Sequence, residues 1–255
     1  MFIVFNKQKI YSYLVAFTTV ITLCVFAFTI AKNPNAVLTA STNKELPIYA
    51  VDTQEKKLAF TINCAWNADD IDKILETLKQ NEVKVTFFVV GDWVTKYPDA
   101  VKKINEAGHE IGNHSNTHPH VNNLSNEENI KQVQECSDKI KSITGKQTIL
   151  YRAPYGEYNN TVIRAAKSAN HVPIQWNLDT LDYTGLTGNE MWARLDGKLK
   201  NGSIILMHNG TEHTADSLDM LLKNTKQAGY KIVTVSELIY KDSYTIDSTG
   251  TQRMQ

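Results

Sequence analysis

The sequence predicts an α/β fold, a mainly parallel sheet that is open or closed into a barrel of about seven strand–helix units. Short apolar runs rich in β-forming residues alternate with amphipathic helical segments from residue 58 onward. Polar and ionisable residues collect where these runs end, and in such folds the site lies at the carboxyl ends of the strands. One long uncharged segment, residues 10–31, precedes this pattern.

The uncharged segment predicts one N-terminal transmembrane helix. As a helix, its 22 residues (10–31) would extend about 33 Å, which is enough to cross a bilayer. Lys7 and Lys9 precede it, so we expect a cytoplasmic N-terminus and an extracytoplasmic domain at the cell membrane. A cleaved signal peptide, which would leave a secreted protein, is the alternative. Its apolar region usually has only ~7–15 residues, which favours the retained anchor.

Composition divides the chain into four parts. Residues 1–32 are the predicted stub and anchor, 33–52 a polar linker, 53–240 one globular domain, and 241–255 a polar tail that we expect to fray. Lys plus Arg and Asp plus Glu number 27 each, so there is no basic field for nucleic acid. No sequence feature indicates a protein partner.

The expected strands are short apolar runs, and the expected helices lie between them. The strands are 58–62, 83–90, 110–112, 148–151, 172–176, 203–207 and 230–235. The helices are 71–78, 99–106, 127–143, 161–168, 190–200 and 217–226. Asp69 and Asp70 precede the first helix, where acidic side chains favour the helix N-terminus.

Three cysteines are too few for a disulfide framework. Cys24 lies in the uncharged segment, which leaves a single bridge between Cys64 and Cys136 open. Cys136 falls on an apolar helical stripe, so we expect it to be buried in the core.

The candidate functional residues follow the expected strands. They are Asn63 and Cys64, His114 and His118, residues 152–155, residues 176–183, and His208. His114 and His118 are four positions apart, so one helical turn would point both imidazoles the same way, as a zinc site requires. Two surface histidines in a polar loop are the alternative for so short a motif.

These segments resemble the polysaccharide deacetylase (NodB-homology) family over residues 58–238. The H-[ST]-x-x-H metal motif of the family matches residues 114–118, and R-x-P-[YF] matches 152–155. D-x-x-D-[WY] matches 179–183, and L-x-H matches 206–208. The resemblance implies a distorted (β/α) barrel and is greatest to the sporulation and cell-wall subset, which often carries an N-terminal anchor.

The resemblance also implies catalytic roles. His114 and His118 would hold a divalent metal, zinc in the first place, which polarises a water molecule and the acetamide carbonyl. His208 would be the general acid and Asp182 would orient it, while Arg152 would pair with the general base.

The expected sugar site lies beside these groups. Tyr155 would offer its backbone N–H to the oxyanion, and Pro154 belongs to the same motif. Trp66, Trp176 and Tyr183 near the strand ends would suit stacking on sugar rings, although aromatic residues at such positions are often simply core or rim.

The first motif departs from the family, which has T-F-D-D-G where this chain has T-I-N-C-A at 61–65. Asn63 occupies the position of the Asp base, and an amide cannot accept a proton at neutral pH. General base catalysis contributes ~10²–10⁴, so activity should be weak unless another group substitutes. Cys64 occupies the position of the metal carboxylate. A thiolate beside two imidazoles would suit zinc, but a small residue without a metal role is slightly favoured.

Two functions from different classes follow. The first is a metal-dependent hydrolase that removes N-acetyl groups from a cell-wall polysaccharide such as peptidoglycan, at N-acetylglucosamine or N-acetylmuramic acid. The second is a catalytically degenerate glycan-binding or morphogenetic protein on the same fold. A metal amidohydrolase for another acyl amide is a weaker third. Asn63 and Cys64 favour the second. The first is favoured by the retained residues His114, His118, Arg152, Asp182 and His208.

Overall fold

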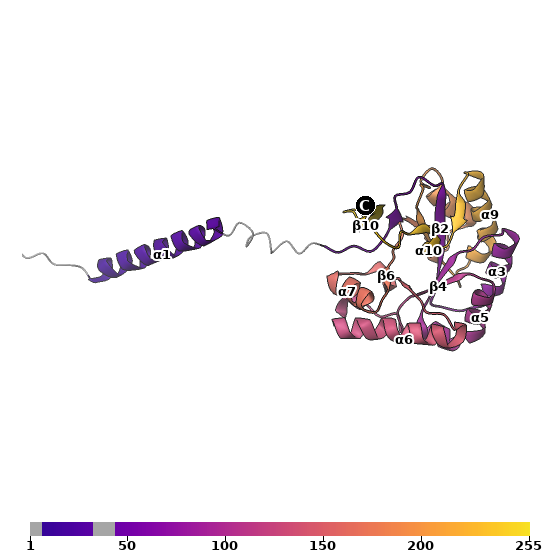
Figure 1. The fold of residues 1–255 in the computed structure, drawn as a ribbon, viewed down its shortest axis with the longest axis horizontal. Coiled ribbons are helices and arrows are strands. Elements are labelled where there is room, and N and C mark those ends of the chain that lie inside the picture. The colour runs from indigo at the N-terminus through magenta and orange to yellow at the C-terminus, as the bar shows by residue number, and fades with distance from the viewer. Residues whose placement is uncertain (1–6, 33–43) are drawn as a thin grey trace, which may run out of the picture. The chain divides into compact units, whose positions relative to one another are not determined.

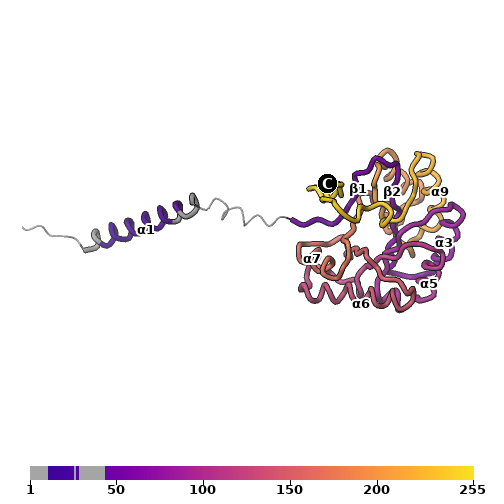
Figure 2. The backbone as a smooth tube through the Cα atoms, in the orientation of Figure 1, coloured from indigo at the N-terminus to yellow at the C-terminus, as the bar shows by residue number. Residues whose placement is uncertain are grey.

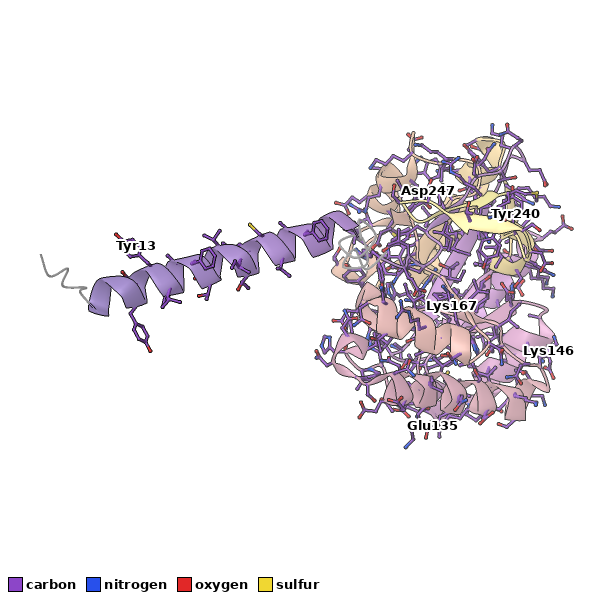
Figure 3. The ribbon with its side chains drawn as sticks, turned by 60° about the vertical axis from the view of Figure 1, so that its left-hand side comes forward. Tyr13, Glu135, Lys146, Lys167, Tyr240 and Asp247 are labelled. Atoms are coloured by element: carbon purple, nitrogen blue, oxygen red, sulfur yellow. The ribbon has the colours of Figure 1, made fainter. Side chains whose placement is uncertain are left out.

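The computed structural model describes residues 7–32 and 44–255, in two units, Met1–Lys44 and Glu45–Gln255. In the first unit, α1 (Lys7–Lys32) confirms that the uncharged segment is helical, and side chains such as Tyr13 project from it (Figure 3). Among the described residues no helix is long and apolar enough to cross a membrane, so the predicted transmembrane span is not supported. Most of the predicted linker, residues 33–43, lies outside the described residues.

The second unit is built on an eight-stranded parallel sheet of order β6-β5-β4-β3-β2-β8-β7, with β9 paired to β2. Its strands are β2 (Lys57–Cys64), β3 (Thr86–Val89), β4 (Glu110–Asn113), β5 (Leu150–Tyr151), β6 (Val172–Pro173), β7 (Leu178–Asp179), β8 (Ile204–His208) and β9 (Lys231–Val233). In the part of the chain that the structure describes, the ladder ends at β6 and β7. The predicted parallel α/β fold is therefore confirmed as an open, distorted barrel.

Helices surround this curved sheet (Figure 1). They are α3 (Ile71–Gln80), α4 (Gly91–Lys96), α5 (Pro98–Glu106), α6 (Asn126–Thr144), α7 (Asn160–Ser168), α8 (Gly188–Leu195), α9 (Thr214–Gln227) and α10 (Val235–Leu238), with 3-10 turns η1 (Val121–Asn123), η2 (Pro154–Gly156) and η3 (Asp182–Thr184). The longest helix in this unit, α6, begins at a capping box formed by Ser125 and Glu128 and ends at Gly145, whose φ is 70°.

The central strand β2 is buried on both faces, and its side chains alternate between them. Leu58, Phe60, Ile62 and Cys64 pack in the cluster formed with the covering helices. The intervening residues therefore point to the inside of the barrel, and Asn63 is one of them. This alternation decides which residues of the first motif can reach a site inside the barrel.

The domain is larger at its N-terminal side than the predicted 53–240. Glu45 pairs with Arg164 at 2.6 Å and with Lys167 at 2.9 Å, so the chain is already fixed to α7 at residue 45. Strand β1 (Ala50–Val51) follows and belongs to a second, three-stranded sheet. The predicted linker is therefore shorter than 33–52.

The prediction that residues 241–255 fray is wrong. They form β10 (Tyr244–Ile246) and β11 (Thr251–Met254), which pair antiparallel, and β11 also pairs parallel with β1. The fully buried Gln252 side chain binds the backbone N–H and C=O of Tyr240 at 2.9 and 2.7 Å. Figure 2 shows the start of this unit beside the C-terminus, and Figure 3 shows Tyr240 and Asp247 there. These bonds satisfy polar backbone groups that a tail would leave to water.

Candidate active site

A pocket of about 590 Å³ opens at the carboxyl ends of the parallel strands. The predicted site residues that line it are Asn63, His114, His118, Tyr155, Trp176, Tyr183 and His208. Arg152 and Asp182 are completely buried beneath it, and Pro154 is buried in η2. Residues from six strand ends thus meet in one place, as the sequence predicts.

Arg152 is a buried cation whose hydrogen bonds go to neutral groups. Its Nη1 donates to Thr61 Oγ1 at 2.8 Å and to Asn63 Oδ1 at 3.0 Å, and its Nη2 donates to the Gln175 carbonyl at 3.0 Å. Its Nε has no hydrogen-bond partner among the described residues. Burial lowers the pKa of Arg152 to about 9, opposed by the charge of Asp179, so it stays protonated at neutral pH.

The guanidinium also lies between two aromatic rings. Its carbon is 4.1 Å from the centroid of Phe88 and 5.4 Å from that of Trp176. These contacts stabilise a charge that has no hydrogen-bonded carboxylate. The predicted pairing of Arg152 with residue 63 is therefore formed, but with an amide in place of a base.

His114 and His118 lie together, with ring centroids 5.0 Å apart. His114 Nδ1 is 2.7 Å from the Arg152 carbonyl. Because a carbonyl only accepts, Nδ1 carries the proton and Nε2 keeps its lone pair. Burial, and then the charge of the neighbouring His118, lowers the pKa of His114, and burial also lowers that of His118. Both rings are therefore neutral at pH 7, the form in which imidazole binds a metal.

The one-turn helix predicted to carry this pair is not formed. Residues 114–118 are a loop in which Ser115 has φ 70° and His118 has φ 55°. Tyr155 and Leu181, at the ends of β5 and β7, are also left-handed, with φ 58° and 53°. Such conformations are strained for residues with a side chain, and they concentrate at functional sites.

His208 and Asp182 form the predicted pair. His208 Nδ1 lies 2.9 Å from Asp182 Oδ1, while Asp182 Oδ2 accepts from the His208 backbone N–H at 2.6 Å and from the Thr214 hydroxyl at 2.7 Å. Both carboxylate oxygens are thus engaged, and the imidazole is fixed with Nε2 as its free nitrogen. Trp66 stacks on the His208 ring at 5.3 Å, and Tyr183 meets it edge-on at 5.4 Å.

Cys64 does not join this site. Its side chain is completely buried in the core cluster, and burial raises the pKa of its thiol well above the usual value. Within residues 7–32 and 44–255, no group of three His, Cys, Asp or Glu side chains is placed to hold a metal. His114 and His118 therefore fit a divalent metal as two ligands. The alternative His2Cys set is not formed, and the burial of Cys64 agrees with the slightly favoured prediction of a small residue without a metal role. Both Cys64 and Cys136 are free thiols, so the bridge left open by the sequence is absent.

Comparison of the sequence with known proteins identifies the family of this chain. Residues 50–174 match the sequence profile described as "Polysaccharide deacetylase". A Bacillus cereus protein named peptidoglycan-N-acetylglucosamine deacetylase is 30% identical over 71% of this chain and 68% of its own length. The chain belongs to the polysaccharide deacetylase family. The resemblance stated from the motifs is thereby confirmed.

Other similar proteins are not named as deacetylases. The Bacillus subtilis protein YlxY, called uncharacterised, is 35% identical over 76% of this chain, which spans 60% of the YlxY length. The solved structure of a CE4 family pseudoenzyme from Bacillus anthracis has a TM-score of 0.73 and 34% identity, covering 75% of this chain and 68% of that one. A mutant of that pseudoenzyme is described as having restored enzymatic activity, with the same TM-score and identity, and 70% of it is covered.

Two carboxylates of this polysaccharide deacetylase domain make contacts that the sequence did not predict, although Asp179 lies in the motif at 179–183 and Asp70 precedes the first expected helix. Asp179 is the carboxylate among the described pocket-lining residues, and its Oδ1 accepts from the Leu181 N–H at 2.8 Å. Asp70 occupies the N-cap position of α3 as expected, but without a capping bond. Its carboxylate instead accepts from Gly210 N at 2.8 Å and Asn209 Nδ2 at 3.2 Å, which holds the loop after β8. A carboxylate beside a strand end was the available signal for both.

Proposed function

We propose that this protein recognises the N-acetylated sugars of a cell-wall glycan such as peptidoglycan, as a degenerate member of the deacetylase family. The observation that carries the proposal is the hydrogen bond from Arg152 to Asn63 Oδ1 at 3.0 Å. It puts an amide at the position that needs a base, inside a pocket whose other polar groups are retained. The relative named as a peptidoglycan deacetylase supports a cell-wall glycan as the ligand. The similar pseudoenzyme structure supports the loss of catalysis.

The rim of the pocket suits a sugar. Trp66, Tyr155 and Tyr183 line it and are 49%, 59% and 51% exposed, a high value for rings that have a core available. Exposed aromatic faces beside hydrogen-bonding groups can stack on a sugar ring. The pocket is also large enough for a ligand of that size.

The residues on the acid side retain their chemistry. His208 can carry a proton at Nε2 and release it to a leaving amine, with Asp182 stabilising the imidazolium through Nδ1. On the base side, Asn63 can only hydrogen-bond a water molecule. The proton of that water molecule therefore has no acceptor at position 63. The missing base alone is expected to lower the rate ~10²–10⁴-fold.

His114 and His118 would hold a divalent metal, zinc in our proposal. When bound, such an ion polarises an acyl carbonyl and a water molecule. Catalytic zinc sites usually have three protein ligands, and Cys64 does not supply the third. The metal is therefore expected to bind more weakly than at a complete site.

Weak but genuine deacetylation is the second candidate. The intact His208–Asp182 pair and the two neutral histidines favour it, because sugar binding alone requires neither. In either case the domain would act outside the cytoplasm, where peptidoglycan lies. A role in sporulation stays a prediction.

Acetate release and glycan binding test both candidates. The full chain, loaded with zinc, is incubated with N-acetylglucosamine oligomers and with peptidoglycan. Co-sedimentation compares native peptidoglycan with the same material after chemical de-N-acetylation. Asn63→Asp, alone and with Cys64→Asp, tests restoration, and His208→Ala in each background is the control.

We expect preferential binding to acetylated peptidoglycan and an acetate release at least ~100-fold slower than that of the best Asp variant. Release by the unaltered chain within tenfold of that variant, and abolished by His208→Ala, would establish the second candidate instead. Equal binding to both peptidoglycan preparations, together with no acetate release from any variant, would refute a role in recognising N-acetyl groups.

A further inference from the structure

The loop between the two metal-motif histidines is held entirely by its neighbours. Ser115 and His118 both have left-handed backbone angles, and residues 114–118 belong to no helix or strand. A loop with two strained residues keeps its shape only when the surroundings impose it. The spacing of His114 and His118 therefore depends on contacts from outside the loop.

Helix α4 provides the contacts on one side. The backbone N–H of Gly91 donates to the Ser115 carbonyl at 2.9 Å, and that of Asp92 donates to the Asn116 carbonyl at 2.8 Å. A Cβ on Gly91 would lie 2.2 Å from Asn116 Oδ1 and 3.0 Å from Asn116 Cα, so a larger residue at position 91 would have to displace Asn116. The loop carbonyls are thus satisfied by backbone groups, which no side-chain substitution removes.

The amide groups on the other side depend on one side chain. Gln132 Oε1 accepts from the Asn116 and Thr117 backbone N–H groups, both at 3.0 Å, and from Ser115 Oγ at 2.8 Å. Gln132 Nε2 donates to Thr117 Oγ1 at 3.1 Å. A single primary amide therefore contacts every residue between the two histidines.

Helix α6 fixes the position of Gln132 relative to the loop. Asn113, which precedes His114, donates from Nδ2 to the Val133 carbonyl at 2.7 Å and to Ser137 Oγ at 2.9 Å. Asn113 Oδ1 accepts from Ser115 N at 2.8 Å. Because these bonds tie the loop to the helix turn that carries Gln132, the amide meets the loop in one register.

We propose that Gln132 is a positioning residue, whose side-chain amide holds residues 115–117 so that His114 and His118 can bind one metal ion. Partners in the outer shell of a metal site typically change its affinity by ~10–100-fold. The inference rests on the proposed function only for the metal-binding role of the two histidines. It requires neither acetate release nor glycan binding.

Co²⁺ titration and amide hydrogen exchange of the full chain test the proposal. Gln132→Ala removes all four bonds, and Gln132→Glu retains the acceptor oxygen for the loop amides. Gln134→Ala is the matched control, because Gln134 is exposed on the same helix and makes none of these bonds. Thermal unfolding of each apo-protein measures any general loss of stability.

For Gln132→Ala we expect a Co²⁺ dissociation constant at least ~10-fold higher and faster exchange at Asn116 and Thr117. The Co²⁺ dissociation constants of Gln132→Glu and Gln134→Ala should stay within about threefold of that of the unaltered chain. Gln132→Glu keeps the acceptor oxygen for the loop amides, and Gln134 makes no bond to the loop. Unchanged Co²⁺ affinity in folded Gln132→Ala, or no Co²⁺ binding by the unaltered chain, would overturn the proposal. Because neither acetate release nor glycan binding is measured, failure of the Gln132 variants is distinguishable from failure of the proposed function, and only an absence of Co²⁺ binding by the unaltered chain would count against the metal site in both.

Discussion

Replacing Asn63 by Asp should make this protein more stable, although it introduces a charge into a buried position. Arg152 is completely buried, and its Nη1 lies 3.0 Å from Asn63 Oδ1. The natural chain therefore already contains the buried cation, without a hydrogen-bonded carboxylate. The substitution supplies that carboxylate at the same position as the amide oxygen.

The expected gain can be worked out from this distance. Two unit charges 3.0 Å apart attract by about 5.5 kcal/mol at an effective dielectric constant of about 20. Burying the new carboxylate opposes this by several kcal/mol, but the desolvation of the guanidinium is common to both proteins. We expect a net increase of about 2 kcal/mol in the free energy of unfolding, or roughly 4–8 °C in Tm.

The pH dependence gives the sign of the interaction. Beside Arg152, the carboxyl introduced by Asn63→Asp has a folded-state pKa below its unfolded value of about 3.9. As pH falls, the unfolded chain takes up the proton first, so the gain is complete well above pH 4 and declines below it. The difference in unfolding free energy between variant and natural chain should therefore be larger at pH 7 than at pH 3.

Urea unfolding at both pH values, followed by far-UV circular dichroism, measures this difference. Asn129→Asp is a matched control, because Asn129 is also buried but its Nδ2 donates to three carbonyls, at 3.0 to 3.3 Å. There the same substitution places an anion against acceptors and should destabilise the protein by about 3 kcal/mol or more. A loss of stability in Asn63→Asp at pH 7, or a gain that is equal at pH 3, would refute the reasoning.

Three further predictions concern the same pocket. Cys64→Asp should lower the unfolding free energy by about 3 kcal/mol or more, because residue 64 faces the core beneath the pocket, and calorimetry checks this. In the Asn63→Asp background, Asp182→Asn should reduce acetate release at least ~10-fold, and unchanged release would show that Asp182 does not assist His208. Trp66→Ala should weaken glycan binding by about 1 kcal/mol, roughly fivefold in Kd, without changing Tm by more than a few degrees, and co-sedimentation with peptidoglycan measures it.

The sequence was sufficient for the parallel sheet and for most residues of the pocket. Apolar runs located the main strands, and parallel strands bring their carboxyl ends to one edge, which places Asn63, His114 and His208 together. Strand β7 was missed because its two residues, Leu178 and Asp179, lie outside the expected apolar runs, whereas the equally short β5 and β6 lie within them. So short a segment has no periodicity to detect.

The orientation of Cys64 could have been predicted and was not. The expected strand ended at residue 62, so residues 63 and 64 were both assigned to a loop, in which either side chain could face the pocket. The observed β2 continues to Cys64. Strict alternation then sends Asn63 and Cys64 to opposite faces. A strand that is two residues longer changes the chemistry assigned to the site.

Other features had no local signal. The left-handed angles of Ser115 and His118 depend on contacts with α4 and α6, which are distant in sequence, so a helical turn was the simpler prediction.

The C-terminal hairpin did have a signal, because Tyr244 and Ile246 alternate with a polar residue before a turn that ends at Gly250. The polar composition of residues 241–255 outweighed it.

The position of β11 between β1 and β10 has a consequence for the order of folding. Ala50 pairs with Thr251, so the first strand of this unit is completed by residues about 200 positions later in the sequence. Such distant pairs form late, because the entropy of closing a long loop must be overcome first. The three-stranded sheet is therefore expected to form after the parallel sheet, whose strands pair over shorter separations.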